Sequence, residues 1–237
     1  MNMAAPLDLA TAEKVGPVFT IAGGGFSGTA IITQLIEKLK TDWHEQADPE
    51  SFPLHTIVIA DPAKDIGPGG PYDHEDDTLL LNQPAYAMSP FERQSGHFVN
   101  WLQERNPDVS RWTLENSFQP RRTYGEYLKE VFSNAVENIG NAPIQVTVVK
   151  QSVSDATHTG LGFAVQSVEG ETWKSDSLIV ANGHFKNGYL ADLRDKEFYF
   201  EDSVSSAEIE GAPSMLLEAP FGLASHLPAS CIDQSPD

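Results

Sequence analysis

The sequence predicts an α/β fold in which a parallel sheet carries a small β-meander as an insertion. Three apolar, strand-like runs lead to this prediction. The first, Val18–Ala22, passes through a group of glycines into the helix-like segment Ala30–Leu39. The second, Leu54–Ala60, ends on an aspartate, and the third, Asp176–Ala181, ends close to a glycine. Buried strands that alternate with helices are typical of parallel sheets.

The first strand leads into a glycine-rich turn, Gly23-x-Gly25-x-x-Gly28, within the stretch VFTIAGGGFSGT. Backbone N–H groups at a helix N-terminus bind a pyrophosphate only if the chain can approach it closely, and a Cβ at Gly23 or Gly25 would prevent that. Gly28 would let the helix pack closely on the strand. We therefore favour a dinucleotide-binding βαβ unit over the alternative, an ordinary structural turn.

The second strand ends on Asp61, where a carboxylate can accept hydrogen bonds from adenosine ribose hydroxyls. Its distance from Gly28 exceeds the roughly 20 residues of the simplest motif. The polar segment Thr41–Pro53 accounts for the excess as an extended helix end and loop. A strand-terminating turn at Asp61-Pro62 is the alternative.

A Gly- and Pro-rich segment, Lys64–Tyr72, follows and is predicted to be neither helix nor central strand. A loop at the carboxyl ends of the first two strands lies where α/β sheets bind ligands, although a surface linker would have the same composition. The acidic run Asp73–Asp77 contains one histidine but lacks metal-ligand spacing. It predicts a solvated turn, and we expect no metal site.

The middle of the chain mixes irregular and helical patterns. Leu79–Pro90 is apolar but broken by prolines, so it should be covered by the core or by a flat ligand. Gly96–Arg105 has helical spacing with a core-like aromatic stripe, and Tyr124–Ile139 also reads as a helix. Arg121 and Arg122, which precede the helix at Tyr124, could bind a phosphate or carboxylate, or could neutralise nearby acidic residues. Their spacing favours neither role over the other.

Short strands Ile144–Lys150, Gly162–Val168 and Glu171–Lys174 predict the small meander. The returning strand that follows them would place Gly183 beside the first glycine loop, where a bulkier residue would collide with a nucleotide. Beyond it the pattern fades. The expected division is an N-terminal extension over residues 1–16, one nucleotide-binding domain over 17–184, and a poorly structured or divergent tail over 185–237.

Composition narrows the classes of partner and compartment. The formal net charge of −19 argues against a nucleic-acid partner, because a phosphate backbone would be repelled. The single cysteine, Cys231, offers no disulfide framework. The N-terminus lacks a secretory pattern and no run reaches the roughly 18 apolar residues of a membrane span, so we expect a cytoplasmic protein without membrane association.

Six motifs in order resemble those of one family, the FAD/NAD(P)-binding proteins that include an FAD-dependent urate hydroxylase and an aspartate N-monooxygenase. They are IAGGGFSGTA (Ile21–Ala30), IADP (Ile59–Pro62), GPGGPY (Gly67–Tyr72), LLNQPAYAMS (Leu80–Ser89), FQPRRTYGEYL (Phe118–Leu128) and IVANGH (Ile179–His184). The fold that this resemblance implies is a Rossmann-like FAD/NAD(P)-binding domain.

The resemblance also implies a site. FAD would lie with its pyrophosphate over Gly23–Gly28, which adds Phe26 and Ser27 to the cofactor contacts, and with its ribose on Asp61. The GPGGPY and LLNQPAYAMS loops would lie toward the flavin ring, with Asn82 and Met88 as ring-side residues. Arg121, Arg122 and Tyr124 would contact flavin or substrate, and Gly183 would pass beside the nucleotide.

The implied activity is an NAD(P)H-dependent flavin monooxygenase or hydroxylase acting on a small molecule, with FAD as cofactor and NAD(P)H as co-substrate. Family members continue into a second glycine-rich unit for NADPH, whereas Gly188, Gly211 and Gly222 form no second fingerprint. The chain thus resembles an N-terminal FAD-binding portion, and a complementing C-terminal fragment is an expected partner.

Two other functions remain open at this stage. One is a nucleotide-binding module without its own catalysis, or a truncated remnant; the other is a simple NAD-dependent dehydrogenase, against which the meander argues. No catalytic side chain can be assigned, because His74, His97 and His184 have no partner that the sequence identifies.

Overall fold

The computed structural model describes residues 16–73, 75–91 and 93–183. Almost all of the predicted N-terminal extension and the whole predicted tail, with Cys231, lie outside the described residues, as do His74 and His184. The described chain forms two compact units. Residues 16–73 and 124–183 make the first unit, and residues 75–91 and 93–123 make the second.

The first unit is built on a four-stranded sheet in the order β3-β2-β1-β7, in which all neighbours are parallel. Its strands are β1 (Val18–Ala22), β2 (His55–Ala60), β3 (Ile144–Val149) and β7 (Ser177–Val180). Every residue of β2 is buried, as a central strand of a parallel sheet requires. The predicted α/β fold with a parallel sheet is therefore confirmed.

Helices cover one face of this sheet. α1 (Phe26–Glu45) and most of α5 (Arg121–Glu137) pack there, and the side chains of Ile21, Ile57 and Ile59 meet Ile32 and Ile36 of α1 without solvent exposure. The apolar residues of α1 recur every three or four positions, which gives the helix one buried stripe. A 3₁₀ turn, η1 (Pro49–Ser51), leads from α1 to β2.

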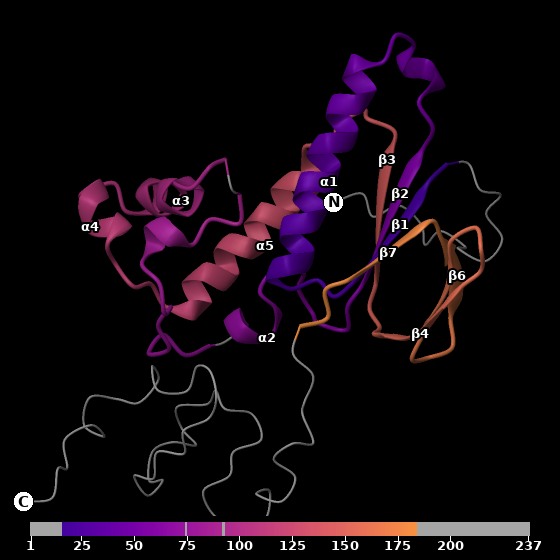
Figure 1. Cartoon of the computed structure of the whole chain (residues 1–237). Coiled ribbons are helices and arrows are strands. Elements are labelled where there is room, and N and C mark those ends of the chain that lie inside the picture. The colour runs from indigo at the N-terminus through magenta and orange to yellow at the C-terminus, as the bar shows by residue number, and fades with distance from the viewer. Residues whose placement is uncertain (1–15, 74, 92, 184–237) are drawn as a thin grey trace, which may run out of the picture. The chain divides into compact units, whose positions relative to one another are not determined.

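A three-stranded antiparallel sheet covers the other face (Figure 1). It consists of β4 (Val153–His158), β5 (Phe163–Ser167) and β6 (Thr172–Ser175). Trp173 of β6 is buried, and its indole Nε1–H donates to Thr20 Oγ1 of β1 at 2.9 Å. This bond satisfies two polar groups in the core and ties the meander to the main sheet.

The second unit contains η2 (Ala85–Ala87), α3 (His97–Arg105) and α4 (Arg111–Glu115). The predicted aromatic stripe of α3 is core, because Phe98, Trp101 and Leu102 are buried. Leu80 and Pro120 form an antiparallel bridge beside these helices. Among the helices described in either unit, none is long and apolar enough to cross a membrane.

Three local predictions are wrong. Gly69–Tyr72 forms a helical turn, α2, which is compatible with Pro71 because the first N–H groups of a helix have no intrahelical partner. The strand at Ile144 belongs to the parallel sheet rather than to the meander, whose first strand is the unpredicted β4. β7 is an edge strand rather than a buried one, and Val180 is 66% exposed.

Candidate functional site

The glycine loop lies between the end of β1 and the start of α1, as the sequence predicted. Gly23 has a φ of 107°, a backbone conformation that residues with a side chain rarely adopt. A Cβ at this position would stand 2.2 Å from the carbonyl oxygen of Ala181. A Cβ on Gly28 would stand 2.0 Å from Gly23 O. Glycine is therefore required at both positions by the loop itself, before any ligand is considered.

The N-terminus of α1 carries donors for an anion. Gly25 is the N-cap residue and no side chain caps it, and the first turn holds no acidic residue. Phe26 and Ser27 are exposed, and their N–H groups have no hydrogen-bond acceptor among the described residues. Orphan N–H groups and the positive end of the helix dipole together favour a phosphate at this position.

Asp61 is half-buried at the carboxyl end of β2 and is bonded to the loop on both carboxylate oxygens. Oδ2 accepts from the N–H of Gly24 at 2.5 Å, and Oδ1 accepts from the N–H of Ala63 at 2.7 Å. The second of these bonds is the turn that the alternative interpretation of Asp61 requires. Each oxygen can accept a further bond, so a ribose hydroxyl can still be bound.

The end of β7 lies beside the glycine loop. Ala181 N donates to Ala22 O at 2.7 Å, and a Cβ on Gly23 would stand 2.8 Å from the Cα of Asn182. Gly183 itself has a φ of 69°, and no atom of the described residues lies within 4 Å of a Cβ built on it. The end of β7 thus lies beside the loop, and its closest contacts there are made by Ala181, followed by Asn182.

The GPGG segment packs directly on the glycine loop, which the sequence did not reveal. Gly67 N donates to Gly24 O at 2.7 Å, and a Cβ on Gly69 would stand 2.9 Å from the Cα of Gly25. Only backbone can come this close. Two glycines separated by one proline were the available signal, but composition does not say which surface such a segment meets.

The other side of the GPGG segment meets α5. A Cβ on Gly67 would stand 2.7 Å from Lys129 N, and a Cβ on Gly125 would stand 2.2 Å from Tyr72 O. Lys129 also forms an ion pair with Asp65 at 3.0 Å, and its hydrogen bond holds the pKa of that carboxyl below the usual value. Glycine-to-backbone contacts therefore join α5, the GPGG segment and the glycine loop.

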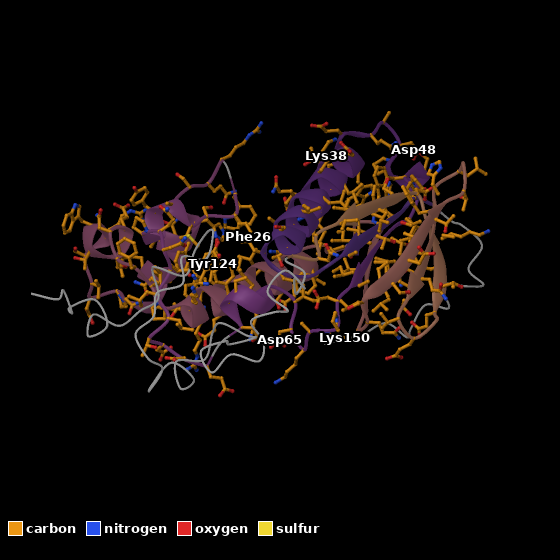
Figure 2. The ribbon with its side chains drawn as sticks, turned by 60° about the horizontal axis from the view of Figure 1, so that its bottom comes forward. Phe26, Lys38, Asp48, Asp65, Tyr124 and Lys150 are labelled. Atoms are coloured by element: carbon orange, nitrogen blue, oxygen red, sulfur yellow. The ribbon has the colours of Figure 1, made fainter. Side chains whose placement is uncertain are left out.

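An aromatic cluster adjoins the start of α1. The ring of Phe26 lies 6.3 Å from that of Tyr124 (Figure 2). The Tyr124 ring in turn lies 4.9 Å from that of Tyr72 and 5.4 Å from that of Tyr127. Burial is the main cause that raises the pKa of the Tyr124 phenol, and burial also raises that of Tyr127. Both phenols therefore stay neutral at alkaline pH values where an ordinary tyrosine ionises.

Three predicted site residues belong to the second unit. Asn82 is exposed and Met88 is half-buried at the end of η2. Arg122 Nη1 lies 3.5 Å from Glu75 O and 3.9 Å from Asp77 Oδ1, so this arginine neutralises a nearby acid. These contacts fit the second of the two interpretations of the arginine pair, and a phosphate or flavin contact stays a prediction.

Of the three candidate catalytic histidines, only His97 lies among the described residues. His97 begins α3, its ring lies 4.8 Å from that of Phe91, and burial lowers its pKa. Within residues 16–73, 75–91 and 93–183, no group of three or more His, Cys, Asp or Glu side chains is placed to hold a metal ion.

A family model described as FAD-NAD(P)-binding matches residues 20–185, which spans the glycine loop, the sheet and the second unit. The chain belongs to this FAD-NAD(P)-binding family. The resemblance stated from the six motifs is therefore confirmed at the level of the family. The comparison with curated proteins gave no match.

Solved structures similar to this family member include flavoenzymes. A flavin-containing monooxygenase from Stenotrophomonas maltophilia is 18% identical, with 70% of this chain and 37% of that chain covered and a TM-score of 0.41. A cyclohexanone monooxygenase is 18% identical, with 72% and 28% covered and a TM-score of 0.43. The bacillithiol disulfide reductase of Staphylococcus aureus is 14% identical, with 70% and 38% covered and a TM-score of 0.41. The chain thus covers between 28% and 38% of the length of these three proteins.

Proposed function

We propose that this chain is the FAD-binding part of a flavin-dependent oxidoreductase, an NAD(P)H-dependent monooxygenase or hydroxylase of a small molecule. One observation carries the proposal. The first helix of a parallel sheet begins at a glycine loop where the N–H groups of Phe26 and Ser27 have no acceptor among the described residues. A carboxylate, Asp61, stands at the end of the neighbouring strand. This combination suits a dinucleotide with a pyrophosphate and an adenosine ribose.

The residues fit the cofactor on chemical grounds. The N–H groups of Phe26 and Ser27 would donate to the pyrophosphate, and the remaining lone pairs of Asp61 would accept from the ribose. Bound flavin would supply the redox chemistry, accepting hydride from NAD(P)H and activating O₂. The chain's own residues would bind and orient it, with Asn82 and Met88 proposed at the ring and Arg122 as a further contact.

The alternative function is a nucleotide-binding module without its own catalysis. The glycine fingerprint at Gly23–Gly28 suits such a module as well, because it provides one dinucleotide site. A complementing C-terminal fragment that supplies the NAD(P)H site is the partner that we propose for the enzyme.

Flavin titration tests the proposal. We expect FAD added to the purified chain to bind saturably, with quenching of flavin fluorescence, and Gly25→Ala to weaken binding roughly tenfold or more, because a Cβ there meets Gly69 Cα at 3.3 Å and disturbs the N-cap. Gly140→Ala is the control, since that glycine lies in the turn between α5 and β3 and a Cβ there meets no atom of the described residues within 4 Å.

The outcomes separate the two functions. Binding of FAD followed by NAD(P)H oxidation once a complementing fragment is added would support the oxidoreductase. Binding without oxidation under any such condition would favour the module. A folded chain that binds no flavin would contradict the oxidoreductase and leave a module for another nucleotide or a remnant.

A further inference from the structure

We infer that the segment Ile66–Gly69 is the support that sets the shape of the dinucleotide loop, and that Gly69 is a positioning residue for the cofactor. The inference rests on the proposed function for the identity of the ligand. Its evidence lies in contacts within the first unit, none of which involves a ligand.

The first step is the contact between Gly69 and Gly25. A Cβ built on Gly69 would stand 2.9 Å from Gly25 Cα and 3.9 Å from both Gly25 N and Phe26 N. Gly25 is the N-cap of α1, and Phe26 carries the first helical N–H. Gly69 therefore lies against the peptide whose N–H is a proposed phosphate donor, and any movement of one displaces the other.

The second step is the attachment of the segment to the loop. Gly67 N donates to Gly24 O at 2.7 Å, while Gly24 N donates to Asp61. The side chain of Ile66 is buried on the loop, because its Cδ1 would lie 2.6 Å from a Cβ on Gly24. Both backbone groups of Gly24 are thus fixed, one by Asp61 and the other by Gly67.

The third step is that the segment has no freedom to retreat. Gly67 lies against the backbone of α5, with Lys129 N at 2.7 Å from a built Cβ and Leu128 C at 2.8 Å. A side chain at Gly69 cannot be relieved by moving the segment outward, because α5 blocks it. The strain must then pass into Gly25 and the start of α1, where preorganised donors determine affinity.

The test compares two glycines with the same backbone conformation. Gly69 has a φ of 57° and Gly140 a φ of 61°, so an alanine is equally disfavoured by φ at either position. In the described part of the chain, however, no atom lies within 4 Å of a Cβ built on Gly140. Gly69→Ala and Gly140→Ala therefore share the strain and differ in the contact with Gly25. Both are made in the full chain.

The first readout is amide hydrogen exchange, which needs no ligand. We expect Gly69→Ala to accelerate exchange in peptides that cover Gly23–Thr29 and Gly67, with no change over Val153–Ser175. Gly140→Ala should leave the loop peptides at the wild-type rate. Equal acceleration in every peptide, or no acceleration at the loop, would overturn the inference.

The second readout is FAD affinity. We expect the Kd to rise roughly tenfold or more in Gly69→Ala and to stay unchanged in Gly140→Ala. If the wild type binds FAD and Gly69→Ala binds it with the same Kd, the inference is contradicted while the proposed function stands. If the wild type binds no FAD, the proposed function fails, and the exchange data still decide whether the segment sets the loop.

Should Gly69→Ala fail to fold, Gly69→Asn serves instead with Gly140→Asn as its control. Asparagine tolerates a positive φ better than alanine, so it retains the Cβ contact with Gly25 and reduces the backbone strain. The same two readouts then apply, with the same outcomes for and against.

Discussion

Asp61 shows how one residue can have two roles that the sequence presents as alternatives. Its carboxylate accepts backbone N–H groups from Gly24 and Ala63, which stabilises the loop in the absence of ligand. Charge-assisted bonds of this kind are stronger than neutral ones and fix the acceptor in place. A carboxylate already held in position loses little entropy when it binds a ribose hydroxyl.

For Asp61→Asn we expect a reduced preference for the ribose 2′-hydroxyl, because an amide oxygen is a weaker acceptor than a carboxylate. In the wild type, ADP should bind about tenfold or more tightly than 2′-deoxy-ADP, and in the variant the two affinities should converge. Isothermal calorimetry of both nucleotides measures this. Asp65→Asn is the control, since Asp65 pairs with Lys129; convergence in the control as well would refute a specific ribose contact.

Among the elements, α5 shows packing that outweighs intrinsic helix propensity. Gly125 lies inside the helix, where alanine is ordinarily about 1 kcal/mol more favourable. In this fold, however, the position lies against Tyr72 O, and a Cβ would come within 2.2 Å of that oxygen. A glycine that is unfavourable for the isolated helix is therefore required by the backbone beside it.

Gly125→Ala should accordingly destabilise the protein, by about 1–3 kcal/mol of unfolding free energy, because α5 must move away from α2. The sign is informative, since helix propensity alone predicts stabilisation. Urea unfolding followed by circular dichroism gives the value. Asn134→Ala, at an exposed position of α5, should be neutral or slightly stabilising; an equal loss there would point to the helix rather than to the contact.

At the scale of the whole molecule, two buried phenols make stability depend on alkaline pH. The pKa values of Tyr124 and Tyr127 are raised in the folded chain, mainly by burial. Above pH 10, the ordinary pKa of tyrosine, the unfolded state loses these protons while the folded state keeps them. Because the unfolded state then binds fewer protons, the free energy of unfolding falls as pH rises.

We therefore expect the contribution of these two phenols to the free energy of unfolding to be independent of pH below about pH 9. Above pH 10 the free energy of unfolding should fall by up to about 1.4 kcal/mol per pH unit for each phenol. Urea unfolding at a series of pH values measures the slope. The double variant Tyr124→Phe, Tyr127→Phe should have a shallower slope whatever its stability at neutral pH. An unchanged slope would mean that these phenols ionise without unfolding.

The sequence determined the elements whose signal is local. Hydrophobic periodicity and glycine placement predicted four features that the structure contains. They are the strand at Val18, the helix after it, the second strand before Asp61 and the core stripe of α3. Ordered motifs also identified the family, because they combine several such local requirements in one order.

Only the tertiary structure decided which strands pair and what the second glycine segment touches. β3 and the meander strands have similar alternation, so periodicity could not assign β3 to the parallel sheet. Gly67, Gly69 and Gly125 are required by backbone atoms far along the chain rather than by their neighbours in sequence. The physical reason is that periodicity indicates which side chains are buried. A close backbone contact between distant segments appears in the sequence only as a glycine, and a glycine does not indicate which segment it contacts.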